Sequence, residues 1–281
     1  MLRALSLLPL SVLYAVRAVV TWFLQILRWR QDIVIGARGR CLPELAPSER
    51  LSIMRCFDGY LNELAAEVLH AGRISHADLE QRMRIENPEV VLRPLQDGRR
   101  VMLLAAHHDK WEWLLQRRST AFDAPLMAVY KPASWSHADR SLRDMHSHIG
   151  AEMIPAKTLV RTLLGRRGRT SLLTLLADQS PSARSTQQVW LQYFGQDIAF
   201  FPGPGLIGAK MRYLPIFIAM RRESRGHYAA RLLPLVSSGE RAEPAQILFA
   251  YVKALEAPLR ENLEYQLWAY NRGKRLRRPH E

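Results

Sequence analysis

Short apolar runs alternate with segments of helical periodicity along the chain beyond residue 98, and this alternation constrains the possible folds more than any other feature. Each run has the length of a strand rather than of a helix. Strands separated by helices form a largely parallel sheet with helices on its faces. We therefore predict an α/β fold with a central, mostly parallel sheet flanked by helices. The predicted strands are 101–106, 126–130, 152–155, 171–177, 188–193, 213–219 and 227–234, and the predicted helices lie near 110–117, 137–148, 158–164, 205–211 and 245–255, with Pro258 as the end or a kink of the last one.

The chain before residue 98 is predicted to be helical. Apolar residues recur at spacings of three and four over residues 43–70, which is typical of an amphipathic helix, and a short helix is predicted at 78–84. We find no internal repeat and no low-complexity linker. The predicted organisation is an N-terminal membrane-anchoring helix at 1–30, a helical part at 31–97 and an α/β body at 98–281.

Residues 4–27 form an apolar stretch in which Arg17 is the one charged residue. A helix of this length would extend over about 36 Å, enough for a hydrocarbon core of about 30 Å. Arginines follow the stretch closely, which predicts that the body lies on the cytoplasmic side. Pro9 and Arg17 would also suit a monotopic helix that lies in one leaflet. A cleaved signal peptide and a buried core helix are the alternatives to an anchor.

The chain of 281 residues has 40 lysines and arginines against 26 aspartates and glutamates, a formal net charge of +14. Such a surplus indicates an anionic partner: anionic lipid, an acidic protein or nucleic acid. Basic clusters occur at 166–169 and 272–278, without the aromatic stacking pattern or recognition helix of a nucleic-acid binder, so nucleic acid is the least favoured partner. Two cysteines exclude a disulfide scaffold and an all-cysteine zinc site.

The segment Ala105–Glu112 (AAHHDKWE) follows a predicted buried strand and enters a helix. Open α/β sheets place their sites at the carboxyl ends of strands. A histidine there can remove a proton from a hydroxyl, and a nearby carboxylate can orient its ring. His107 is the candidate base and Glu112 its partner, provided that His107 lies on the turn before the helix. His108, four residues before Glu112, is the alternative base. The alternative to a catalytic role is purely structural: the two histidines lie on the surface beside the N-terminus of a helix, and Asp109 is the N-cap of that helix.

The H-x4-E pattern of His107 and Glu112, with Trp111, resembles a block of the bacterial lipid A biosynthesis acyltransferases, the late or secondary enzymes of lauroyl and myristoyl transfer. These belong to the H-x4-D/E glycerolipid acyltransferase class. The chain departs from the usual pattern at residues 108–110 (HDK) and has Lys131 where arginine is common. The other blocks that resemble the family, in the family's order, are Cys41–Leu45 (CLPEL) with Ser48–Arg50 (SER), Val129–Pro132 (VYKP), Ala177–Gln179 (ADQ), Tyr193–Gly195 (YFG), Gly203–Ala209 followed by Leu214–Phe217 (LPIF), and Trp268 with Arg272 and Lys274.

The resemblance implies a glycerolipid-acyltransferase-like fold and an O-acyltransferase of the cell inner membrane, with its catalytic body on the cytoplasmic face. It implies transfer of a fatty acyl chain from an acyl thioester, on acyl carrier protein or coenzyme A, to a hydroxyl of a lipid A-type lipid. No metal and no cofactor beyond the thioester are expected. The alternative is a non-enzymatic, basic, membrane-surface binding protein with a degenerate site. The implied catalytic residues are His107 and Glu112, and the implied substrate-binding or oxyanion residues are Lys131, Asp178, Gln179 and Arg272.

Two other patterns suggest different chemistry. Residues 203–208 satisfy G-x-G-x-x-G, a dinucleotide-binding signature. Pro204 removes a phosphate-facing N–H there and Pro202 interrupts the preceding strand, so we favour helix packing as the role of these glycines. Three histidines between 137 and 148 suggest a metal site, but their spacing is more typical of a solvated helix face.

Overall fold

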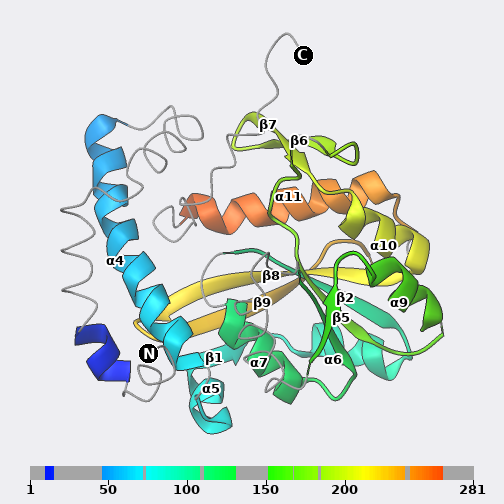
Figure 1. Ribbon diagram of the computed structural model, residues 1–281, viewed down its shortest axis with the longest axis horizontal. Helices are drawn as coiled ribbons and strands as arrows, with labels where there is room; N and C mark the ends of the chain where they lie inside the picture. Colours follow the sequence, from blue (N-terminus) through cyan, green and yellow to red (C-terminus); the bar gives the residue numbers. More distant parts are fainter. Residues whose placement is uncertain are drawn as a thin grey trace.

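The computed structural model describes residues 10–15, 46–71, 74–107, 111–130, 151–166, 168–182, 185–237 and 241–261. Helices and strands alternate along the chain, as the apolar periodicity predicts (Figure 1). The elements in chain order are α4 (Pro47–Ala71), α5 (His76–Arg82), β1 (Met83–Ile85), α6 (Glu89–Gln96), β2 (Arg100–Ala105), α7 (Trp111–Ala121), β3 (Leu126–Tyr130), β4 (Glu152–Pro155), α9 (Leu159–Gly165), β5 (Leu172–Leu176), β6 (Val189–Tyr193), β7 (Gln196–Phe200), α10 (Gly203–Met211), β8 (Tyr213–Ser224), β9 (His227–Pro234) and α11 (Pro244–Glu261).

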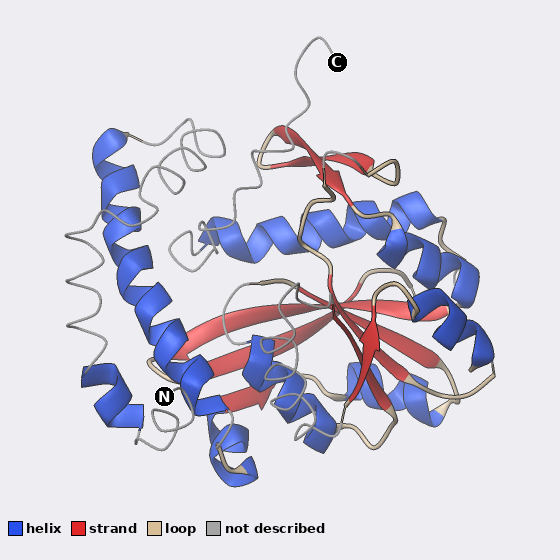
Figure 2. Cartoon of the chain, viewed as in Figure 1, coloured by secondary structure: helices blue, strands red, loops and turns tan. Residues whose placement is uncertain are grey.

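Seven strands form the central sheet in the order β1-β9-β8-β2-β5-β3-β4. Every neighbouring pair is parallel except β8 and β9, which form an antiparallel hairpin. Helices α10 and α11 lie on one side of the sheet, and α5, α6 and α7 lie on the other (Figure 2). The predicted α/β architecture with a mostly parallel sheet and flanking helices is confirmed.

Both faces of β2 are buried, because a helix layer covers each side of the sheet. Met102 and Leu104 point into the core beneath α11, while Val101, Leu103 and Ala105 point into the core beneath α7. Side chains alternate between faces along a strand, so a strand that is buried on both sides needs apolar residues at every position. This explains the continuous apolar run VMLLA in the sequence.

Three elements were not predicted from the sequence: β1, α6 and β7. Strand β1 has three residues, too few to show a periodicity, and it pairs with β9 at the edge of the sheet. Strand β7 forms a separate hairpin with β6, and the turn between them has positive φ angles at Phe194 (50°) and Gly195 (69°), as two-residue hairpin turns require. Helix α11 continues to Glu261, so Pro258 is not its end. The helix predicted at 137–148 lies outside the described residues.

The glycines of the G-x-G-x-x-G pattern allow α10 to approach α11 closely. A Cβ added at Gly208 would lie 2.8 Å from Cδ1 of Ile247, and one at Gly205 would collide with the carbonyl oxygen of Pro244. The pattern also follows β7, a strand of the antiparallel hairpin, and not a strand of the parallel sheet. The expected helix-packing role is confirmed for Gly205 and Gly208, while a Cβ at Gly203 would meet no neighbouring atom.

Part of the predicted N-terminal anchor packs against the body. Residues 10–15 are helical, Leu10 and Leu13 are buried, and the Tyr14 hydroxyl donates a hydrogen bond to Glu67 of α4. The rest of the predicted anchor lies outside the described residues. Within the described ranges, no helix has both the length and the apolar character needed to cross a membrane.

Two buried carboxylates of α4 attach this helix to the tip of the β8–β9 hairpin. Glu63 accepts hydrogen bonds from Arg222 and Arg225, and Glu67 accepts one from Tyr228 at 2.9 Å. Proximity to Glu67 and burial raise the pKa of the Tyr14 hydroxyl well above its usual range, burial being the larger cause. Buried carboxylates are costly unless they are paired, so each of these contacts favours one position of α4 along the hairpin.

Arg118 of α7 is a buried cation. Its side chain is 2% exposed, and its Nε donates to the carbonyl oxygen of Leu114 at 3.3 Å. Among the described residues, no group forms a hydrogen bond with its Nη1. Burial alone lowers the pKa of Arg118 to about 9. A buried charge without a counter-ion destabilises the folded state.

We expect Arg118→Met to raise the free energy of unfolding by about 1–4 kcal/mol, because an apolar side chain of similar length replaces a buried charge that has no counter-ion among the described residues. The lowered pKa of Arg118 favours its neutral form in the folded state, so the wild type gains stability as the pH rises above about 9 and the variant does not. Urea unfolding at about pH 7 and about pH 10 measures both effects. Arg117→Met, which breaks an exposed ion pair with Glu80, is the control and costs less than about 1 kcal/mol. If Arg118→Met proved less stable than the wild type at about pH 7, the buried charge of Arg118 would not be destabilising.

Candidate functional site

Parallel pairing of β2 with β5 places the two chain segments that follow these strands side by side. Ala105 pairs with Leu176, and the next backbone N–H, that of Ala177, donates to the carbonyl oxygen of Ala105 at 3.1 Å. His107 and Asp178 therefore both emerge at the carboxyl edge of the sheet, although 71 positions separate them in the sequence. This is the edge at which open α/β sheets carry ligand and active sites.

His107 contacts the two residues Asp178 and Gln179. Its Nδ1 lies 2.6 Å from Oδ1 of Asp178, and its Nε2 lies 3.3 Å from the side-chain nitrogen of Gln179. The Asp178 side chain is 3% exposed, while the His107 ring is 24% exposed. One ring nitrogen thus faces a buried carboxylate, and the other lies on the accessible side.

Both contacts specify the same tautomer of His107. An ionised carboxylate only accepts hydrogen bonds, so Nδ1 carries the proton and donates it to Asp178. An amide nitrogen only donates, so Nε2 is the acceptor in its contact with Gln179. The unprotonated, basic nitrogen of His107 is therefore Nε2, on the accessible side.

This arrangement has the features of a general base. A base needs a lone pair that a substrate can reach and a partner that stabilises the charged form after proton transfer. Nε2 provides the lone pair, and the buried Asp178 carboxylate faces the ring from the opposite side. The same pairing of histidine with a carboxylate occurs in acyl-transfer enzymes with unrelated folds.

Helix α11 supports the end of strand β2. The buried hydroxyl of Tyr251 donates to the carbonyl oxygen of Ala105 at 3.2 Å, two residues before His107. The Tyr251 ring also packs edge-to-face against Phe217 of β8, with ring centroids 5.7 Å apart. Tyr251 was not predicted from the sequence, because a tyrosine on the apolar face of an amphipathic helix gives no signal beyond burial.

The structure describes some of the predicted site residues and not others. Asp178, expected at a substrate-binding or oxyanion position, contacts His107 directly, and Gln179 contacts it too. Glu112 is the second residue of α7, and its side chain is not among those described, so its pairing with His107 stays a prediction. Lys131, Arg272 and the alternative base His108 lie outside the described residues. In the part of the chain that the structure describes, no group of three or more His, Cys, Asp or Glu side chains could hold a metal ion.

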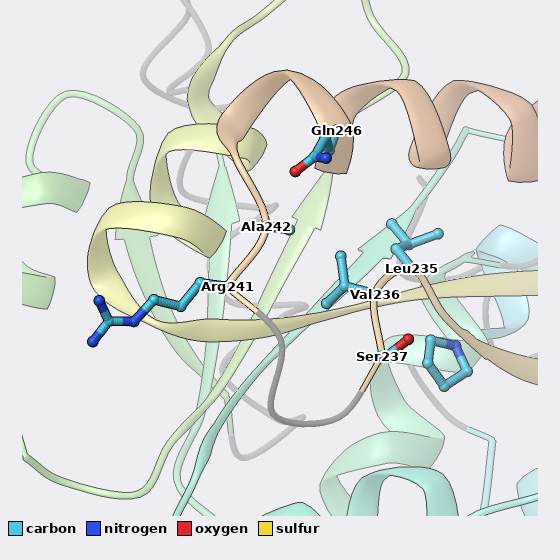
Figure 3. Close-up of a pocket in the computed structure, with 7 residues that line it drawn as sticks. Leu235, Val236, Ser237, Arg241, Ala242 and Gln246 are labelled. Carbon is cyan, nitrogen blue, oxygen red and sulfur yellow. The ribbon is translucent and has the colours of Figure 1, made fainter.

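A cavity of about 820 Å³ is lined by residues that follow β9 and by residues around the start of α11 (Figure 3). Leu235 and Val236 follow β9, and Gln246 of α11 is above them, while the Arg241 side chain extends away (Figure 3). Strand β9 runs antiparallel to β8, and Leu235 donates to the carbonyl oxygen of Pro215 near the start of β8. This cavity and the His107 site are therefore separate.

The tautomer of His107 can be observed directly. We expect nitrogen NMR of labelled histidine to show neutral His107 protonated at Nδ1, because Asp178 binds that proton. In Asp178→Ala the ring loses this acceptor, and the form protonated at Nε2 should become populated. His227 at the β8–β9 turn contacts Ser224 and the carbonyl oxygen of Arg225 instead, and it serves as the reference in the same spectra, where its signals should not change. A wild-type ring protonated at Nε2 in its neutral form would contradict the assignment.

The chain was compared with known proteins and protein families. No curated protein matches it in sequence. The family model described as bacterial lipid A biosynthesis acyltransferase matches residues 1–275, nearly the whole length, and this range contains His107, Asp178 and Gln179. The chain therefore belongs to the bacterial lipid A biosynthesis acyltransferase family.

Proposed function

We propose that this protein transfers a fatty acyl chain from an acyl thioester to a hydroxyl of a lipid A-type lipid, with His107 as the general base. Family membership supports an acyltransferase of lipid A biosynthesis. The single observation that carries the proposed mechanism is the contact of 2.6 Å between His107 Nδ1 and Asp178 Oδ1 at the carboxyl edge of the sheet. It leaves Nε2 as the nitrogen that accepts a proton from the acceptor hydroxyl.

The proposed reaction needs one base and no covalent intermediate on the protein. The acceptor hydroxyl gives its proton to Nε2 of His107 while its oxygen bonds to the thioester carbonyl carbon. The positive charge that forms on the ring is stabilised by the Asp178 carboxylate. The tetrahedral intermediate then collapses, the carbon–sulfur bond breaks, and the sulfur leaves as a thiol with the proton from Nε2. A thioester is already activated, so we propose no metal and no cofactor.

The resemblance assigns cationic and polar roles to other residues. We propose Lys131 or Arg272 as the cation that stabilises the oxyanion or binds a phosphate of the acceptor. Glu112 is proposed as a second carboxylate near the base. The net charge of +14 supports anionic partners, namely a phosphorylated lipid as acceptor and, as donor, an acidic acyl carrier protein or the likewise anionic coenzyme A. Coenzyme A is the alternative donor.

We propose that the protein acts at the cytoplasmic face of the cell inner membrane, because its acceptor is a membrane lipid. The apolar stretch 4–27 is the proposed anchor, either transmembrane or monotopic. Leu10 and Leu13 lie inside this stretch and are buried against the body, which favours the monotopic placement over the transmembrane one.

We expect His107→Ala to lower acyl transfer by about 10²–10⁴-fold while the fold is retained, because the variant lacks the base. Transfer from an acyl thioester to a phosphorylated glucosamine lipid is measured by mass spectrometry of the lipid, and circular dichroism reports the fold. His227→Ala, which removes a partly exposed histidine at the β8–β9 turn, is the control and should retain activity. Undiminished transfer by His107→Ala would favour the alternative, a non-enzymatic lipid-binding protein.

Two carboxylates are candidates for the partner of His107, and a pair of isosteric variants separates them. We expect Asp178→Asn to lower kcat/KM by about 10²–10⁴-fold, because an amide does not stabilise the charged ring and no longer enforces the tautomer. Glu112→Gln should cost less, since Asp178 already binds Nδ1. The measurement is kcat/KM with the same donor and acceptor. If Glu112→Gln proves the more damaging change, the orienting role belongs to Glu112.

A further inference from the structure

The side chain of Gln179 contacts Nε2 of His107, the nitrogen that accepts the proton in the proposed reaction. Its amide nitrogen is 3.3 Å from Nε2 of His107, the ring nitrogen that has the lone pair. Asp178, the preceding residue, holds the opposite side of the same ring. Two consecutive residues, Asp178 and Gln179, therefore contact the two ring nitrogens of His107.

A base that is open to solvent creates a problem for acyl transfer. The His107 ring is 24% exposed, so water can reach it. Nε2 could then take a proton from water while the water oxygen bonds to the thioester carbonyl carbon. Breakage of the carbon–sulfur bond, with the proton returning from Nε2 to the sulfur, would release a free fatty acid and a thiol. Hydrolysis and transfer use the same base and the same steps, and they differ only in the hydroxyl that attacks.

We infer that Gln179 is a specificity-determining residue that keeps Nε2 from activating water until the acceptor hydroxyl displaces its amide. This inference rests on the proposed function of His107. A water molecule has to break the amide hydrogen bond with no other binding energy to offset the loss. The acceptor brings contacts from the rest of the lipid, and these can offset it. The amide therefore slows hydrolysis more than transfer.

Two substitutions of Gln179 separate its hydrogen bond from its bulk. Gln179→Met removes the donor and keeps a side chain of similar length, while Gln179→Ala removes both. Gln187→Met, at an exposed glutamine in the same connection between β5 and β6, is the matched control. A medium-chain acyl group is supplied as its coenzyme A thioester and as its acyl carrier protein thioester. Thiol release without acceptor measures hydrolysis, and mass spectrometry of a phosphorylated glucosamine lipid measures transfer.

We expect hydrolysis without acceptor to rise about two- to tenfold in both Gln179 variants, the factor that one ordinary hydrogen bond supplies. Transfer should change less, so the ratio of transfer to hydrolysis falls. A general loss of structure would lower both rates and could not produce this result. Unchanged hydrolysis in Gln179→Met overturns the inference, and so does a rise confined to Gln179→Ala, because bulk would then account for the effect.

The His107→Ala variant shows whether a failure lies in this inference or in the proposed function. If His107→Ala loses both hydrolysis and transfer while the Gln179 variants match the wild type, the inference fails and the base assignment stands. If His107→Ala cleaves the thioesters as fast as the wild type, or if the wild type transfers no acyl group from either donor, the proposed function fails and the inference fails with it.

Discussion

Parallel pairing of β2 with β5 is the contact on which the site depends. The register that places Ala105 opposite Leu176 brings His107 and Asp178 to one edge of the sheet, and a shift of one residue would turn one of these side chains to the other face. Both strands are buried on both faces beneath helices, so their pairing lies in the interior of the protein. Local sequence around either residue shows nothing of this proximity.

Buried aromatic and polar contacts connect the surrounding helices to the sheet. Tyr251 of α11 donates to the carbonyl oxygen of Ala105, and Trp113 of α7 packs edge-to-face on Tyr228 of β9, with centroids 6.0 Å apart. Tyr228 in turn donates to Glu67 of α4. These buried hydroxyl and carboxylate groups favour one arrangement of the helices around the sheet. A shifted helix would leave one of them without its hydrogen-bond partner.

Much of the fold was predictable from the sequence, and the exceptions have physical reasons. The predicted strand at 227–234 has the bounds of β9, and the strands at 101–106, 126–130 and 171–177 agree with the structure to within a residue or so, because long apolar runs carry a clear signal. Strand β1 was missed because three residues have no periodicity, and it exists through its pairing with β9. Strand β7 was missed because its hairpin depends on a turn at Phe194 and Gly195, without the Asn-Gly or Asp-Gly signature of such turns.

The sequence by itself determined that the chain is an α/β protein and that His107 follows a buried strand, because hydrophobic periodicity and strand ends are local properties. It also indicated that the glycines at 203–208 serve helix packing. Only the tertiary structure decided which carboxylate described here faces His107 and which ring nitrogen is the base. The order of strands in the sheet depends on contacts between residues far apart in the chain. Such contacts leave no spacing in the sequence from which Asp178, 71 positions away, could have been read as the partner of His107.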